Sequence, residues 1–159
     1  MTFLCYSTYV KKDRGNIVGL FDFLKSKDEV SYEEIYNDLD VFTAASLAMP
    51  KMNNPFLLDN KSIHPMIFGY FMGVIDYVAR YYKLSEKEKR KVCTHYLLKN
   101  FADNEMDRAK ELLKYCDKIM QTEEACNYAL RGKLAMKKWK AGGPMADYAT
   151  MGLIRILND

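Results

Sequence analysis

The sequence predicts an all-α protein, a single compact bundle of about six to seven helices that spans residues 1–159 as one domain. Three observations lead to this prediction. Apolar residues recur at helical spacing through most of the chain after residue 30, most connections between the helical stretches are short, and the chain holds only eight Gly and four Pro. An all-β chain needs many more turns than these residues supply.

The first 15 residues are a different kind of segment, an N-terminal extended arm or short strand element followed by a turn. Residues 2–10 are rich in aromatic and β-branched side chains without helical spacing. Residues 11–16 are typical of a turn, and the apolar spacing after it indicates a short helix near 17–26. A second interpretation pairs residues 2–10 with 17–21 as a β-hairpin, which needs cover from the helices to be stable.

Helix start signals divide the chain after residue 30. Capping boxes begin at Ser31 and Ser85, and further N-caps are predicted at Asp103 and Thr122. The helix after Ser31 is expected to end before Pro50, because a proline disfavours the helical conformation of the residue that precedes it. This end leaves a long loop at residues 50–64 between two helices.

Glycine and proline bound the later helices. Pro65 opens a helix that is apolar on nearly all sides as far as Tyr82, which is typical of a central helix. Gly142 and Gly143 end the next-to-last helix, and Pro144 opens the last one. Because the connections after residue 64 are only a few residues long, we expect successive helices to be antiparallel neighbours.

Charge and cysteine content narrow the class of protein. The net charge is +3 and the isoelectric point is about 8.5, below the range typical of a dedicated nucleic-acid domain. No two of the four cysteines lie at metal-ligand spacing, and three of them fall within predicted helices. We therefore expect a reduced, cytoplasmic protein without a metal or other cofactor. The apolar stretch 65–82 contains Asp76 and Arg80, which favours a buried helix over a membrane span.

Asp76 is the most informative residue for function, because it is the one acidic residue between Ser62 and Ser85. Burying a carboxylate is costly unless it is paired, and Arg80 lies four residues later on the same helix face. The favoured interpretation is a structural ion pair at the edge of the bundle. The alternative is a small-ligand sensor or an enzyme, with a pocket around Asp76 and Arg80 whose other candidate residues are Tyr70, Tyr77 and Tyr81.

Aromatic and apolar residues outside the helical stripes point to an interaction function. They fall in two segments, near the N-terminus at Phe3, Tyr6 and Tyr9, and in the 50–64 loop at Phe56, Leu57 and Leu58. The favoured hypothesis is a non-enzymatic cytosolic interaction or regulatory protein that forms a homodimer or binds a protein partner through these residues. The sequence contains none of the G-x-S-x-G, P-loop, H-E-x-x-H or G-x-G-x-x-G motifs of common enzyme and nucleotide-binding families.

Two basic runs support a further alternative, a nucleic-acid-binding regulator. The main candidate is the helical segment 131–140, with Arg131, Lys133, Lys137, Lys138 and Lys140. The aromatic residue beside them, Trp139, lies on the same helical stripe as Ala135 and is expected to point into the core. The other run begins at Lys83 and ends at Lys91, and two glutamates interrupt it. A solvated helix surface is the favoured interpretation of both runs.

Overall fold

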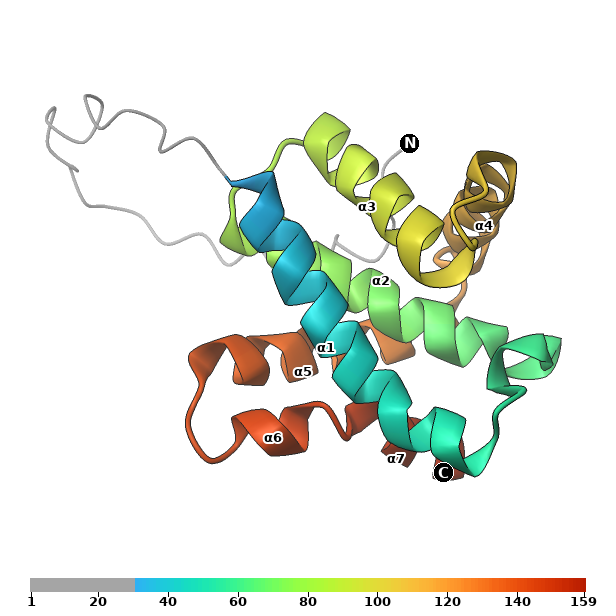
Figure 1. Cartoon of the computed structure of the whole chain (residues 1–159), viewed down its shortest axis with the longest axis vertical. Coiled ribbons are helices and arrows are strands. Elements are labelled where there is room, and N and C mark those ends of the chain that lie inside the picture. The colour runs from blue at the N-terminus through green and yellow to red at the C-terminus, as the bar shows by residue number, and fades with distance from the viewer. Residues whose placement is uncertain (1–30) are drawn as a thin grey trace, which may run out of the picture.

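The computed structural model describes residues 31–159, which form an all-α fold (Figure 1). The predictions for residues 1–30, an arm or strand and a helix near 17–26, lie outside the described residues. The described residues contain no strand, which confirms the all-α prediction for them. Their elements are α1 (Tyr32–Asn53), the 3₁₀-helices η3 (Leu57–Asp59) and η4 (Lys61–Ile63), α2 (His64–Tyr81), α3 (Glu86–Phe101), α4 (Met106–Ile119), α5 (Glu123–Ala141), α6 (Ala146–Ala149) and α7 (Gly152–Asn158).

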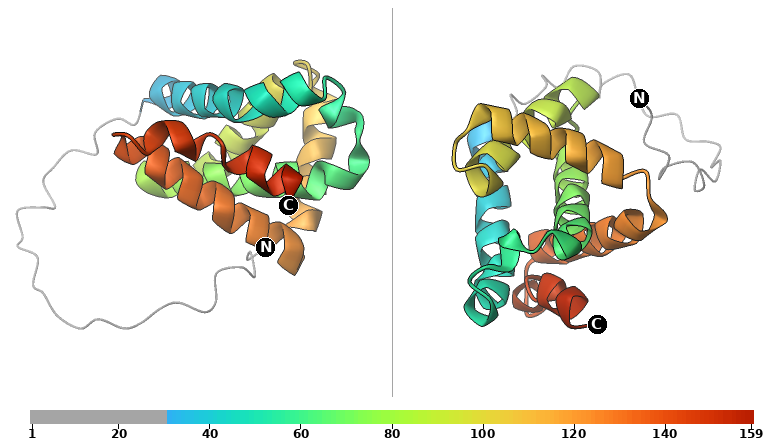
Figure 2. Two further views of the ribbon diagram at one scale, coloured as in Figure 1. Left: turned by 90° about the horizontal axis from the view of Figure 1, so that it is seen from below. Right: turned by 90° about the vertical axis from the view of Figure 1, so that its right-hand side faces the viewer.

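Helix α2 is the centre of the bundle, as its apolar sequence predicts. Helix α1 crosses one side of α2, α5 packs along another side, and α3 and α4 pack together (Figures 1 and 2). Trp139 of α5 points inward as predicted and meets Phe42 of α1 edge-on, with 5.7 Å between the ring centroids. Helix α5 packs mainly against α2 and not against α4, so the prediction of antiparallel sequence neighbours is wrong for this pair.

Local signals place several helix ends where the sequence predicts them. The Ser85 hydroxyl accepts a hydrogen bond from the Glu88 amide, and the Glu88 carboxylate accepts one from the Ser85 amide at 2.7 Å, which completes a capping box. The Thr122 hydroxyl caps α5. Gly142 ends α5 with a φ of 71°, a conformation that favours glycine.

At the start of α1 only half of the predicted capping box forms. The Ser31 hydroxyl accepts a hydrogen bond from the Glu34 amide at 3.4 Å, as expected for an N-cap. The Glu34 carboxylate accepts instead from the Tyr82 hydroxyl at 2.9 Å. Glu34, which the capping-box motif assigns to the start of α1, therefore links this helix to Tyr82, the residue that follows α2.

Helix α1 continues through Pro50 to Asn53, so the predicted end before this proline is wrong. A proline lacks the amide hydrogen and leaves the carbonyl of the residue four positions earlier without its usual helical partner. Burial offsets this loss, because Pro50 and Leu47 lie in the core and the Asn54 amide donates to the Pro50 carbonyl at 3.0 Å. The connection to α2 is accordingly shorter than predicted and holds η3 and η4.

Asp103 does not cap α4, because Asp103 and Asn104 both adopt left-handed backbone conformations, with φ of 51° and 62°. Asp and Asn tolerate this conformation better than most residues, and here it turns the chain between α3 and α4. Helix α4 therefore begins later than predicted, with Glu105 as its N-cap residue. The predicted last helix is divided into α6 and α7, and between them the Thr150 hydroxyl donates to the Asp147 carbonyl at 2.8 Å.

The crossing of α2 and α5 brings the two backbones into direct contact. A Cβ atom built on Gly73 would lie 1.8 Å from the Ala129 carbonyl oxygen. A Cβ atom on Gly132 would lie 1.9 Å from the Tyr70 carbonyl oxygen. Backbone atoms cannot rotate away as a flexible side chain can, so any larger residue at these positions must push the helices apart. Glycine is required here for the close approach of the helices.

We predict that Gly73→Ala and Gly132→Ala each destabilise the fold by about 2 kcal/mol or more, because the added methyl group overlaps backbone atoms. Alanine otherwise stabilises a helix relative to glycine by about 1 kcal/mol, so the sign of the effect is informative. Gly69→Ala, whose Cβ would lie 2.9 Å from the Ala125 carbonyl oxygen, should cost less. Urea unfolding followed by circular dichroism measures all three, and a stabilised Gly73→Ala variant would contradict the close crossing.

Candidate functional site

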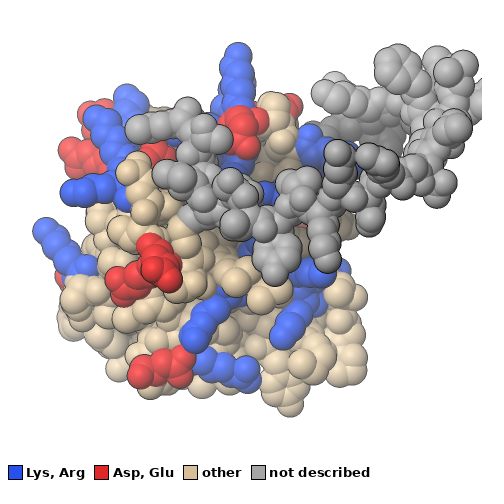
Figure 3. Space-filling view, turned by 180° about the vertical axis from the view of Figure 1, so that it is seen from behind, with Lys and Arg blue, Asp and Glu red and all other residues tan. Residues whose placement is uncertain are grey.

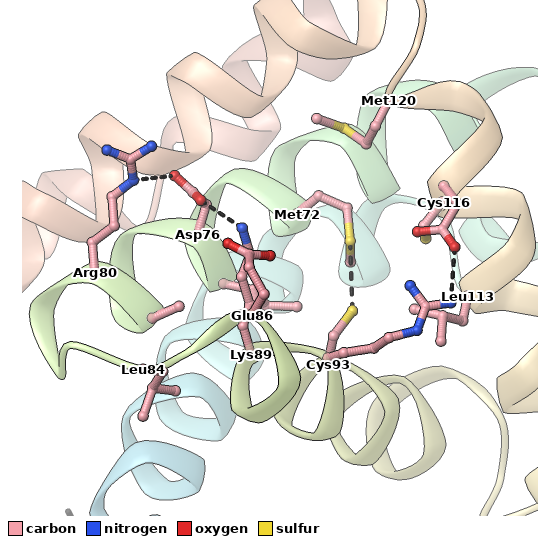
Figure 4. Close-up of a pocket in the computed structure, with 14 residues that line it drawn as sticks. Met72, Asp76, Arg80, Leu84, Glu86, Lys89, Cys93, Leu113, Cys116 and Met120 are labelled. Carbon is pink, nitrogen blue, oxygen red and sulfur yellow. Dashed lines mark hydrogen bonds and ion pairs between the residues drawn. The ribbon is translucent and has the colours of Figure 1, made fainter. Parts of the chain in front are cut away.

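A pocket of about 670 Å³ opens between α2, α3 and α4 (Figure 4). This volume lies within the range of small-molecule binding sites. Helix α2 contributes Met72, Asp76 and Arg80 to one wall, at four-residue spacing along one helix face. Side chains of α3 form a second wall, and Leu113 and Asp117 of α4 close the pocket. Three helices that are separate in sequence therefore share one cavity.

Four sulfur-containing side chains line the pocket: Met72, Cys93, Cys116 and Met120. The Cys93 and Met72 sulfur atoms lie 3.8 Å apart (Figure 4). Burial, with the nearby Asp117 carboxylate, raises the pKa of the Cys93 thiol to about 12. Burial also raises the pKa of the Cys116 thiol. Both cysteines are free thiols that stay protonated at neutral pH, so they act as small polarisable packing groups and not as thiolate nucleophiles.

Asp76 lies at one end of the pocket with only 5% of its surface exposed. Its carboxylate accepts hydrogen bonds from Arg80 Nε at 3.1 Å, Lys89 Nζ at 2.8 Å and Lys133 Nζ at 3.3 Å. Charge-assisted hydrogen bonds of this kind offset the cost of burying a carboxylate. Because the three donors belong to α2, α3 and α5, one carboxylate connects three helices.

Within the part of the chain that the structure describes, the charged residues that line the pocket are balanced in sign. Three are acidic and three are basic, namely Asp76, Glu86 and Asp117 against Arg80, Lys89 and Arg90. In a second ion pair of the lining, Arg90 Nη2 lies 3.1 Å from the Asp117 carboxylate. The lining therefore combines an apolar, sulfur-rich surface with ion pairs, and its charges favour a ligand without net charge.

Of the five residues predicted for a pocket around Asp76, the structure brings only Asp76 and Arg80 to this cavity. Tyr70 is fully buried in the core, where its ring stacks against Phe42 with 6.5 Å between centroids. The Tyr77 and Tyr81 rings lie 6.1 Å apart, and neither lines the pocket. Helical geometry explains the difference, since adjacent residues lie about 100° apart around the axis.

Several residues of this pocket were missed by the sequence reasoning. The four-residue spacing from Met72 to Asp76 was a usable signal for a shared helix face. The pairing of Lys89 and Lys133 with Asp76 had no comparable signal, because these residues lie 13 and 57 positions away along the chain. Cys93 is buried in the core, yet it also borders the cavity.

A second polar cluster joins α1, α5 and the end of α2. The Tyr82 hydroxyl lies 2.8 Å from the Asp38 carboxylate, and Lys140 Nζ lies 2.6 Å from the same carboxylate. Lys140 Nζ also lies 4.7 Å from the centroid of the Tyr81 ring. Burial, followed by the hydrogen bonds to Asp38 and Glu34, raises the pKa of Tyr82 far above its usual value. Tyr82 therefore remains a hydrogen-bond donor at neutral pH.

The five basic residues predicted for nucleic-acid binding have different structural roles. Lys133 and Lys140 pair with Asp76 and Asp38, and Arg131 lies 3.0 Å from Asp159. The two that are exposed and form no ion pair with a described residue are Lys137 and Lys138. On the face in Figure 3, basic and acidic side chains are interspersed on the described surface. This arrangement gives little support to a phosphate-binding surface on α5.

The predicted interaction residues also divide into different environments. Leu57 is 6% exposed and packs in the core, and Leu58 is partly buried. Phe56 is 73% exposed, and Met52, near the end of α1, is 81% exposed. The terminal candidates Phe3, Tyr6 and Tyr9 lie outside the described residues. The exposed apolar residues of this region, which we call the α1-end surface, are Met49, Met52 and Phe56.

Comparisons with known protein families, with curated proteins and with solved structures give no match for this chain. Within residues 31–159, no group of three or more His, Cys, Asp or Glu side chains is arranged to hold a metal ion. None of the helices in that range is long and apolar enough to cross a membrane. The function is therefore inferred from the pocket and from the exposed surfaces.

We predict that Asp76→Asn destabilises the fold by about 3 kcal/mol, because three basic groups then converge on a neutral amide. Asp117→Asn is the matched control. The Asp117 side chain is 30% exposed and pairs with the exposed Arg90, so its replacement should cost less than about 1 kcal/mol. Urea unfolding at neutral pH compares the two variants, and equal effects would argue against a structural role for Asp76.

Proposed function

We propose that the protein binds a small, mostly apolar molecule without net charge in the pocket between α2, α3 and α4. The observation that carries this proposal is the composition of the cavity, in which sulfur and aliphatic groups line about 670 Å³ and the charged groups are balanced. Thioether side chains adapt to ligands of different shape, because they are flexible and polarisable. Met72 and Met120 therefore suit an apolar guest.

Binding, as in a ligand sensor, is better supported than catalysis. Cys93 and Cys116 are protonated at neutral pH, which removes the nucleophilic form of the thiol. The Asp76 carboxylate is engaged by basic groups from three helices. The paired Asp76 carboxylate can therefore orient a bound ligand. Neither this carboxylate nor the two protonated thiols is an activated nucleophile.

The proposal is tested with two fluorescent probes that share an aromatic core, neutral N-phenyl-1-naphthylamine and anionic 8-anilinonaphthalene-1-sulfonate. We expect saturable fluorescence enhancement with the neutral probe and weaker binding of the sulfonate, because the pocket has no excess positive charge. In Leu113→Trp, the larger ring fills the cavity and should weaken binding of the neutral probe at least tenfold. Fluorescence titration measures both dissociation constants.

The matched control is Leu130→Trp, which makes the same substitution on the exposed side of α5, outside the pocket. This variant should bind the neutral probe like the unmodified protein. Equal binding by both tryptophan variants would place the probe elsewhere and contradict the proposal. Absence of saturable binding in the unmodified protein would contradict it as well.

A second candidate function is self-association, which the exposure of the α1-end surface favours. Met49 and Met52 are three residues apart on α1 and share one helix face. Phe56 lies three residues after the end of α1. Aromatic and methionine side chains are enriched at protein interfaces and rare as large exposed groups. The occupant that we propose for this surface is a second copy of the chain.

We predict that the protein forms a dimer and that Phe56→Asp shifts it to a monomer, because a charged group replaces an apolar contact. Leu130→Asp is the control, since Leu130 is also exposed but belongs to α5 and not to the α1-end surface. Sedimentation equilibrium measures the mass of each variant. A monomeric unmodified protein, or a Phe56→Asp variant that remains a dimer, would exclude this interface.

A further inference from the structure

A groove on the outer side of α3 differs from the pocket in the charge of the residues that line it. It lies where α3 meets α1 and α4, and its walls include Tyr36 of α1 and Met106 of α4. Residues Lys87, Lys91 and His95 of α3 follow one another at four-residue spacing along it. We refer to this feature as the α3 groove.

The charged residues of the range 31–159 that line the α3 groove are all basic. They are Lys87, Arg90 and Lys91, and no acidic residue of this range lines it. Arg90 pairs with Asp117 at its other side, whereas Lys87 and Lys91 are exposed and form no ion pair with a described residue. Two solvated ammonium groups four residues apart on a helix attract an anionic partner.

The other end of the groove is apolar and aromatic. Leu98 is partly buried, and Met106 is 46% exposed beside it in the same groove. Between the two ends, the Tyr36 ring lies against the His95 imidazole with 4.1 Å between centroids and a tilt of 32° between the ring planes. The groove therefore offers a cationic end, an aromatic middle and an apolar end.

We propose that the α3 groove binds an acidic peptide segment in which an apolar side chain lies close to the carboxylates. Charge complementarity places the carboxylates against Lys87 and Lys91, and the apolar side chain then reaches Leu98 and Met106. A nucleic acid fits this groove less well. Its affinity depends on many phosphate contacts, and here the apolar end occupies the surface where further basic groups would be needed. This site shares Arg90 with the pocket proposed above, but the proposal does not depend on the ligand of that pocket.

Isothermal titration calorimetry with unlabelled probes tests the proposal. The probes are a short peptide of Glu-Glu-Leu repeats, the same peptide with Gln in place of Glu, the same peptide with Ser in place of Leu, and oligo-dT. We expect the Glu-Glu-Leu peptide to bind most tightly and its affinity to fall with added salt. Both substituted peptides should bind at least tenfold more weakly, because one loses the contacts with the cationic end of the groove and the other loses the contacts with the apolar end.

Matched variants locate the binding site. Lys87→Glu/Lys91→Glu should weaken the Glu-Glu-Leu peptide at least tenfold, whereas Lys137→Glu/Lys138→Glu reverses an exposed lysine pair on α5 and should leave its affinity unchanged. Met106→Ser should weaken binding of the Glu-Glu-Leu peptide. Met145→Ser, which changes another exposed methionine, should leave this binding unchanged. Circular dichroism confirms that each variant is folded. Equal loss in both lysine variants, or tighter binding of oligo-dT than of the peptide, would overturn the proposal.

Discussion

The backbone contact between α2 and α5 is the constraint on which the rest of the structure depends. Gly73 and Gly132 each bring a helix within van der Waals distance of the partner's carbonyl groups, so the two axes can approach no closer. This crossing uses one face of α2 completely. The residues of α2 that remain for other roles lie on its other sides, and Met72 and Asp76 there form a wall of the pocket.

The Asp76 cluster connects the pocket to that crossing. Lys133 of α5 lies one position after Gly132, so the close approach of the helices also brings its ammonium group to the Asp76 carboxylate at 3.3 Å. Lys89 reaches the same carboxylate from α3 at 2.8 Å. A structural role and a place in the wall of the pocket are therefore not alternatives for Asp76. One carboxylate connects α2, α3 and α5 and also forms a polar part of the cavity that α2 and α3 share with α4.

Sequence motifs predicted local structure such as helix caps. They did not predict which residues pair when they are far apart in the sequence. The Ser85 capping box and the central position of α2 followed from a few neighbouring residues. The α2–α5 crossing does have a signal in the sequence, since Gly69 and Gly73 share a helix face at four-residue spacing. This spacing does not identify which helix packs against that face. Pro50 was misjudged because burial within the tertiary structure outweighed a local preference of the backbone.

The basic run of α3 shows why a charge pattern must be interpreted around the helix axis. Lys89 turns inward to Asp76 and Arg90 turns to Asp117, while Lys87 and Lys91 lie on the outer groove. Adjacent residues of a helix point in directions about 100° apart, so a continuous basic run is divided among several faces. One helix thereby separates a charge-balanced pocket from a cationic groove. These two surfaces of α3 differ in charge because of this angular division, and the net charge of the chain reflects neither of them.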